Sequence, residues 1–268
     1  MARKDDYYNR AKQEGYRARS AYKLKQIDSE VGLFDDGAVV VDLGAAPGGW
    51  MQVAAEKVGK TGTVVGVDRQ RIDPLEDTEA TVELLRGDIT EEETHERITS
   101  TVESVTGIQP EGKQNGPVDV VLSDMAPNMS GDYDLDHARS VYLAKQAANV
   151  GQAVLRAGGD LVIKVFQGRD LDDLEAELEE DFEYVRRYTP EASRDESSEI
   201  YLIARSFLTA PVRPGDELTV EITDTGQEGD GITTVEGYTL FVSGANEGES
   251  IDVRVTDCKA NFGFAERI

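Results

Sequence analysis

The chain has 268 residues, of which 39% are hydrophobic, and its formal net charge is −25 at pH 7. This length can hold one large domain and a small one, and the lack of any run of about 18 apolar residues excludes a membrane span. A single cysteine, Cys258, excludes an internal disulfide and a zinc site built from cysteines, and we expect no metal. The first ten residues, MARKDDYYNR, contain no apolar stretch of the kind that a secretory signal needs, so we expect a cytoplasmic protein.

Acidic residues are spread along the whole chain rather than gathered in a tail. There are 53 Asp and Glu residues against 28 Lys and Arg residues. In about 1 M salt the Debye length is roughly 3 Å, so such charges no longer repel one another strongly. The composition therefore favours adaptation to multimolar salt, and the alternative is an ordinary acidic enzyme.

The first 25 residues depart from this acidity. They carry eight Lys and Arg residues against three acids, and Tyr7, Tyr8, Tyr16 and Tyr22 are interleaved with the basic residues. Positive charge combined with stacking rings suits a phosphate backbone and unstacked bases, whereas the alternative is a solvated basic tail. Residues 20–31 have apolar positions at helical spacing, which predicts a helix with Ser20 as its N-cap.

The most informative segment is VVVDLGAAPGGW, residues 39–50. It predicts a buried strand, Val39–Asp42, that runs into a loop with almost no side chains and then into a helix. Such a loop lets a ligand approach backbone N–H groups at the helix start. The glycines at 44, 48 and 49 lack the Gly-x-Gly-x-x-Gly spacing of dinucleotide sites, so a nucleotide-containing cofactor is expected but NAD is disfavoured.

Residues 50–208 alternate between amphipathic segments and apolar β-forming segments. The predicted strands are Thr63–Asp68, Val82–Arg86, Val118–Ser123, Asp160–Phe166, Tyr184–Tyr188 and Ile200–Ala204. The predicted helices are Trp50–Val58, Thr90–Val105, Ala138–Arg156 and Leu171–Leu178. This alternation predicts an α/β fold, a mostly parallel sheet with helices on both faces. The two histidines, His95 and His137, lie in polar helical stretches, and we expect both at the surface.

Proline and glycine at 211, 214 and 215 end this pattern. Five short alternating segments follow: Leu218–Ile222, Ile232–Val235, Thr239–Val242, Ser250–Val255 and Phe262–Ala265. Glycines separate them, which predicts a small closed β-barrel of the oligonucleotide-binding type. We therefore expect two domains, residues 1–208 and 212–268.

Several predicted strands end in an acid, namely Asp42, Asp68, Asp88 and Asp124. In an open parallel sheet, ligands bind beyond the carboxyl ends of the strands. Asp68 is placed to accept hydrogen bonds from ribose hydroxyls, and Asp88 from an adenine amino group. For each acid considered by itself, the alternative to ligand binding is a structural role in which its carboxylate caps the loop.

Lys164 lies inside the apolar run LVIKVF, where an unpaired lysine is costly. Asp124 ends the neighbouring predicted strand, so its carboxylate should meet Lys164. Glu199 precedes the last strand of the sheet and Lys23 lies on the helix of residues 20–31, and either could reach the same rim. These groups could remove a proton from a bound hydroxyl, with structural pairing as the alternative.

Six ordered motifs resemble the FtsJ-like ribosomal RNA 2′-O-methyltransferases over about residues 7–206. They are YRARSAYKLKQI, VVDLGAAPGGW, VVGVD, LSDMAPNMSG, LVIKVFQG and SSEIYLIA. The resemblance implies a Rossmann-like class I methyltransferase sheet and S-adenosylmethionine as cofactor. It also implies a catalytic tetrad of Lys23, Asp124, Lys164 and Glu199. The cofactor-binding residues that it implies are Gly48, Trp50, Asp68, Asp88 and Asp124.

Residues 212–268 resemble the TRAM domain, an RNA-binding barrel, and suggest an archaeal type. This segment holds four bases and twelve acids, so binding would depend on stacking and hydrogen bonds, with Asn261, Phe262 and Phe264 as candidates. For the two phenylalanines the alternative is core packing.

Together these features predict methyl transfer to a ribose 2′-oxygen, at a uridine of 23S ribosomal RNA, with ribosomal RNA or the large ribosomal subunit as partner. The alternatives are a 2′-O-methyltransferase of transfer RNA or another RNA, a non-catalytic RNA-binding protein, and an NAD-dependent enzyme.

Overall fold

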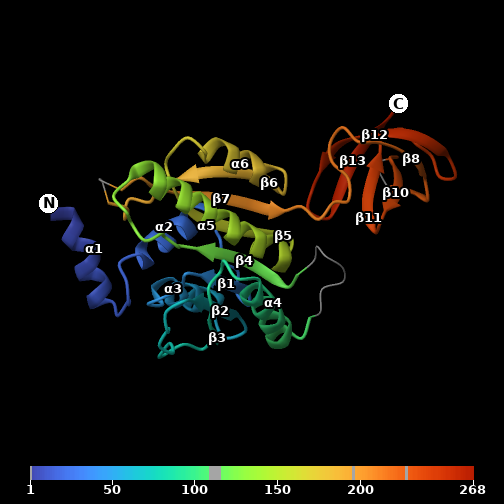
Figure 1. Ribbon diagram of the computed structural model, residues 1–268. Helices are drawn as coiled ribbons and strands as arrows, with labels where there is room; N and C mark the ends of the chain where they lie inside the picture. Colours follow the sequence, from blue (N-terminus) through green and yellow to red (C-terminus); the bar gives the residue numbers. More distant parts are fainter. Residues whose placement is uncertain (1, 109–115, 195–196, 227–228) are drawn as a thin grey trace.

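The computed structural model describes residues 2–108, 116–194, 197–226 and 229–268, which form two β-sheets (Figure 1). The larger sheet has seven strands, in the order β3 (Thr81–Arg86), β2 (Thr63–Asp68), β1 (Val39–Leu43), β4 (Val118–Ser123), β5 (Leu155–Phe166), β7 (Glu199–Phe207) and β6 (Phe182–Tyr188). Strands β1 to β5 are parallel, whereas β7 runs antiparallel to both of its neighbours.

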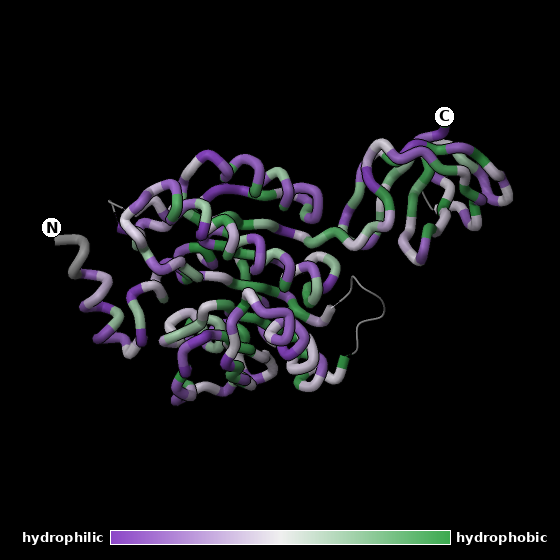
Figure 2. The backbone as a smooth tube through the Cα atoms, in the orientation of Figure 1, coloured by the Kyte–Doolittle hydropathy of each residue, from purple (hydrophilic) through white to green (hydrophobic). Residues whose placement is uncertain are grey.

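Helices cover both faces of this sheet. They are α2 (Ala21–Val31), α3 (Gly49–Val58), α4 (Glu92–Thr106), α5 (Tyr133–Val154) and α6 (Leu171–Glu179), whereas α1 (Ala2–Gln13) packs against α2. Alternate strand residues serve opposite faces, because Val40, Val120 and Val162 pack with α2 and α3, whereas their successors pack with α4, α5 and α6. The apolar residues accordingly follow the strands in Figure 2. The α/β prediction is confirmed.

Two helical features differ from the prediction. Helix α5 begins at Tyr133, before the expected Ala138, because the Asp132 side chain accepts a hydrogen bond from Leu135 N and caps the helix. Ser20 occupies the N-cap position of α2, but its side chain makes no capping bond.

Three of the four tyrosines near the N-terminus pack against one another, whereas Tyr8 is exposed. Tyr7 and Tyr16 pack against the buried Tyr22, with ring centroids 5.4 and 6.0 Å away. Arg10 lies 4.9 Å from the Tyr22 ring centroid and Lys25 lies 4.2 Å from that of Tyr16. The basic and aromatic side chains that suggested an RNA contact therefore also join α1 to α2.

The smaller sheet curls into the predicted barrel type. Its order is β8 (Glu217–Glu221), β12 (Ser250–Cys258), β13 (Phe262–Arg267), β11 (Tyr238–Val242), β10 (Gly231–Val235) and β9 (Asp224–Thr225). Its two ends meet where Thr223 N donates to Ile232 O at 2.8 Å and Thr233 Oγ1 donates to Glu221 O at 2.8 Å. The two-residue β9 is the strand that the sequence did not predict.

The barrel is attached at the end of β7. Since β7 runs against the parallel strands, that end lies at the amino edge of the large sheet (Figure 1). The barrel contacts this edge, because Ala260 N donates to Glu183 Oε1 at 3.3 Å. No helix among the described residues is both long and apolar enough to cross a bilayer.

Candidate active site

A cavity of about 650 Å³ opens at the carboxyl edge of the large sheet. Its walls come from the ends of four adjacent strands, β1 to β4, and include Gly44, Asp68, Asp88 and Asp124. This volume falls within the range of small-molecule sites, roughly 300–1,000 Å³. The position is the one that open α/β sheets use for ligands.

The glycine-rich loop after β1 forms one wall because it lacks side chains. Gly44 has φ of 76°, and a Cβ there would lie 2.5 Å from Met125 Cγ. Glycine is therefore required both for the backbone conformation and for the close approach of the β4 end.

Arg17 holds the same loop from outside. Its guanidinium donates to Pro47 O at 3.2 Å, Asp73 O at 2.5 Å and Pro74 O at 2.5 Å. A Cβ on Gly48 would lie 2.9 Å from Arg17 Nη1. Gly48 thus faces Arg17 and is not among the residues that line the cavity.

Two acids of the cavity wall are fixed by backbone donors. The Asp68 carboxylate accepts hydrogen bonds from Ala46 N at 3.0 Å and Gln70 N at 2.7 Å. The hydrogen bond from Thr90 N at 3.0 Å lowers the pKa of Asp88, and the Arg69 guanidinium at 3.2 Å lowers it further. Both carboxylates therefore present fixed acceptor oxygens to a ligand.

Asp42 is fully buried beneath this wall, and neither carboxylate oxygen has a hydrogen-bond partner among the described residues. Burial raises its pKa well above the usual value, and the nearby Asp124 and Asp68 carboxylates raise it further. The raised pKa favours the neutral, protonated carboxyl of Asp42, because a buried charge there would lie near two other carboxylates.

Trp50 does not line the cavity either. Its indole is buried, donates from Nε1 to Ser20 O at 2.8 Å and lies 5.8 Å from the Tyr201 ring centroid. In this structure the side chain joins α3 to α2 and β7.

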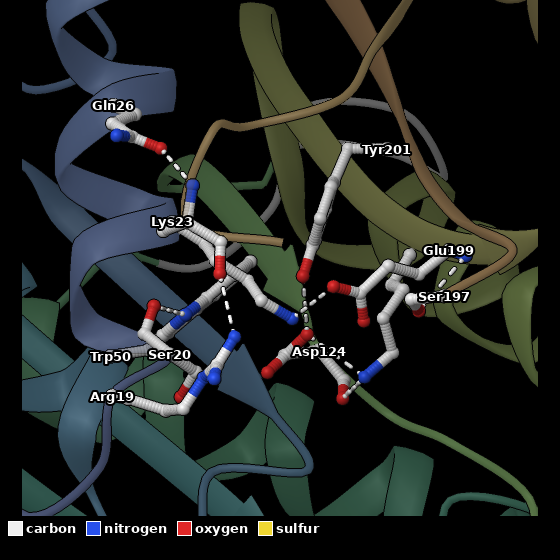
Figure 3. A network of polar contacts seen from close by, with 11 residues as sticks. Arg19, Ser20, Lys23, Gln26, Trp50, Asp124, Ser197, Glu199 and Tyr201 are labelled. Carbon is white, nitrogen blue, oxygen red and sulfur yellow. Dashed lines mark hydrogen bonds and ion pairs between the residues drawn. The ribbon is translucent and has the colours of Figure 1, made fainter. Parts of the chain in front are cut away.

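Beside the cavity, two lysines and two acids form neighbouring ion pairs (Figure 3). Lys164 Nζ lies 2.9 Å from Asp124 Oδ1, and Lys23 Nζ lies 2.6 Å from Glu199 Oε1. Lys23, Lys164 and Glu199 are only 7%, 8% and 9% exposed. The four predicted residues are therefore adjacent in space.

The strand geometry explains this convergence. Lys164 pairs in register with Tyr201, and Glu199 lies two residues before Tyr201, so all three side chains point to the face covered by α2. Because β7 is antiparallel, its first residue lies at the carboxyl edge of the parallel strands. Lys23 reaches the same place from α2.

Tyr201 is a member of this cluster that the sequence did not single out. Its hydroxyl donates to Asp124 Oδ1 at 2.7 Å, the oxygen that also binds Lys164. Burial raises the pKa of Tyr201 well above its usual value, so the phenol stays a neutral donor. The available signal was its spacing of two from Glu199 on an alternating strand.

His137 contradicts the surface prediction, because it is buried. Its Nδ1 donates to Phe166 O at 3.0 Å and its Nε2 accepts from Asp170 N at 3.2 Å, so it holds the segment after β5. His95 is half-buried. Within the described residues, no group of three or more His, Cys, Asp or Glu side chains has a metal-binding arrangement.

Comparisons with known proteins agree with this arrangement. Residues 16–207 match the FtsJ-like methyltransferase family and residues 211–268 match the TRAM domain. A protein of Haloarcula marismortui named ribosomal RNA large subunit methyltransferase E is 60% identical over the full length of both chains. A protein of the same name from Methanothrix thermoacetophila is 47% identical over 99% of this chain and 98% of its own.

A solved structure shares the fold of the larger unit. It is described as a ribosomal RNA methyltransferase of Plasmodium falciparum, and it superposes with a TM-score of 0.59 at 25% identity. The match covers 72% of this chain and 98% of that one.

Proposed function

Because the chain belongs to the FtsJ-like methyltransferase family and carries a TRAM domain, we propose that it methylates a ribose 2′-oxygen of 23S ribosomal RNA, at a uridine, with S-adenosylmethionine as methyl donor. The family matches support a division into a catalytic domain, residues 1–208, and an RNA-binding domain, residues 212–268. The partner that we propose is the ribosomal RNA or the large ribosomal subunit.

The observation that carries the proposal is the pair of buried ion pairs beside the cavity. A cofactor pocket alone would fit many reactions, but the ion pairs Lys164–Asp124 and Lys23–Glu199 lie next to it, and we assign these groups to proton transfer. A hydroxyl acceptor needs such a group, since its proton must leave as the new bond forms.

The cavity wall suits the proposed cofactor. We assign Asp68 to the ribose hydroxyls and Asp88 to the adenine amino group, because both carboxylates are fixed and line the cavity. Gly48 and Trp50 remain part of the proposed cofactor site through the loop and helix start that they form, rather than as cavity walls.

When bound, S-adenosylmethionine supplies an electrophilic methyl group on a positively charged sulfur. Lys164 Nζ is the atom that we assign to remove or steer the 2′-hydroxyl proton. Asp124 orients this amine through both its carboxylate and its backbone carbonyl. Lys23 and Glu199 position the ribose. Lys23, Lys164 and Glu199 are all buried, which limits the access of water to the site.

For the barrel, we propose RNA binding by stacking. The ring centroids of Phe241, Phe262 and Phe264 lie 5.6–6.0 Å from one another. Phe262 and Phe264 are 38% and 40% exposed. Such exposed rings can stack with unpaired bases without help from basic residues.

The test is methyl transfer from labelled S-adenosylmethionine to deproteinised large-subunit ribosomal RNA, to large subunits and to transfer RNA, followed by mapping of 2′-O-methyl positions. We expect a single 23S position. We expect Lys164→Ala to lower the rate at least about 100-fold, while cofactor binding measured by calorimetry is unchanged. Preferential methylation of transfer RNA, or full activity of Lys164→Ala, would contradict the proposal, and cofactor binding without any transfer would indicate a non-catalytic role.

A further inference from the structure

A second cavity, of about 360 Å³, adjoins the first. The two share wall residues, including Arg69, Ala126 and Asn128, and the second is completed by Arg139 and Tyr142 of α5. The loop between β4 and α5 contributes Ala126 and Asn128 to both cavities. The end of this loop is fixed, because Ser130 N and Gly131 N donate to the buried Asp136 carboxylate at 2.8 and 3.1 Å.

Arg139 is unusual in this acidic chain. Among the side chains that the structure describes, the Lys and Arg residues with neither a hydrogen bond nor an ion pair are Lys12, Lys60, Arg139 and Arg194. Of these four, Arg139 is the one that lines a cavity described above. The charge of Arg139 helps to lower the pKa of the Asp136 carboxylate, but its guanidinium makes no hydrogen bond or ion pair with described residues, so its N–H donors are available to a ligand.

Arg69 adds a second guanidinium to the same wall. It is 73% exposed at its side chain, and its ion pair with Asp88 uses Nε, so its terminal nitrogens make no hydrogen bond with described residues. Two like charges on one small cavity repel each other, and a bound anion relieves that repulsion. The planar fork of arginine matches the oxygens of a phosphate.

Tyr142 supplies a different kind of contact. Its side chain is 51% exposed although it is large and apolar, and it lies on α5 one helical turn after Arg139, at a spacing of three that puts both on one face. An exposed ring beside cations suits a nucleotide, whose base stacks while its phosphate binds the guanidinium groups.

We propose that this second cavity binds a nucleotide of the substrate RNA that neighbours the methylated one. Arg139 and Arg69 hold its phosphate, and Tyr142 stacks against its base. The cavity shares Ala126 with the first cavity, two residues after Asp124 of the proposed catalytic cluster, so an RNA whose target ribose reaches that cluster can extend into it, and the occupant that we propose is therefore RNA rather than a free anion. This inference rests on the proposed function and adds to it a specific RNA-binding subsite.

The test compares Arg139→Ala, Tyr142→Ala and Tyr142→Phe with the wild type, and Lys60→Ala is the matched control because Lys60 is an equally unpaired cation away from both cavities. Equilibrium binding of a large-subunit ribosomal RNA fragment is measured over a series of KCl concentrations. Cofactor binding is measured separately by calorimetry with S-adenosylhomocysteine.

We expect the Kd for RNA to rise about tenfold in Arg139→Ala and in Tyr142→Ala, with cofactor affinity unchanged. Tyr142→Phe and Lys60→Ala should bind RNA like the wild type. Loss of Arg139 should also lower the slope of log Kd against log salt concentration by about one, whereas loss of Tyr142 should not.

Two results would overturn the inference. One is a Kd for RNA within about twofold of the wild type in both alanine variants. The other is a loss of cofactor affinity that matches the loss of RNA affinity, which would assign the cavity to the cofactor. Failure of the wild-type protein itself to bind or methylate ribosomal RNA would instead refute the proposed function.

Discussion

The ion pair between Lys23 and Glu199 allows a test that separates stability from catalysis. Its atoms lie 2.6 Å apart, and the two side chains are 9% and 11% exposed. At an effective dielectric constant of about 20, the attraction over this distance is about 6 kcal/mol, most of which offsets the cost of removing both charges from water. The net stabilisation is therefore small, but removal of one partner leaves the other charge buried and alone.

We expect Lys23→Met and Glu199→Gln each to lower the free energy of unfolding by about 3–5 kcal/mol. For a domain of this size that corresponds to a fall in Tm of roughly 10 °C, measured by circular dichroism at constant high salt. The double variant should lose much less than the sum of the two single losses, because it leaves no unpaired charge.

Methyl transfer provides the second measurement. If the pair positions the ribose, the double variant regains stability but not kcat. Recovery of full activity in the double variant would show that the pair is only structural. Additive losses of stability would refute the reasoning about burial.

Three further predictions follow from the cavity and the composition. Asp68→Ala should raise the Kd for S-adenosylmethionine about 10- to 100-fold in calorimetry, because a fixed charged acceptor is lost, whereas unchanged affinity would contradict the assignment to the ribose. Because the pKa of Asp42 is raised, this group binds more protons in the folded protein than in the unfolded chain between the unfolded value of about 3.9 and the raised value, so its own contribution to stability should increase as pH falls through that range. Asp42→Asn should flatten this dependence in urea titrations, and an unaltered profile would show that another group is responsible. Dialysis from multimolar KCl into low salt should unfold the protein, as monitored by circular dichroism, because its net charge of −25 is then unscreened; full stability in low salt would refute the adaptation.

The sequence was a good guide wherever a residue is governed by strand periodicity. Lys164 and Asp124 meet because their strands are neighbours, and the apolar runs identified those strands correctly. The catalytic roles of these residues stay a prediction. The α/β class and the barrel type followed from the same periodicity, since alternating apolar positions specify which faces are buried.

Contacts between distant segments were not predictable in this way. Tyr22 lies among basic residues, a pattern typical of RNA-binding segments, but it is buried by α1, which the sequence analysis did not predict as a helix. His137 lies in a polar stretch, and only the return of the chain after β5 buries it. Tyr201 lies in an apolar run that is typical of a core strand, and its importance comes from Asp124, a neighbour that tertiary packing supplies. Asp42 was identified as an acid at a strand end, but its complete burial was not predicted.

The reversed direction of β7 sets a length scale for substrate recognition. Glu199 begins this strand at the reacting edge, and the barrel follows its last residue, Phe207, at the opposite edge. Nine strand residues span about 30 Å, so β7 separates the proposed active site from the attachment point of the barrel by about this distance. If one RNA binds both the proposed active site and the barrel, we expect its two bound segments to be separated by a distance of this order.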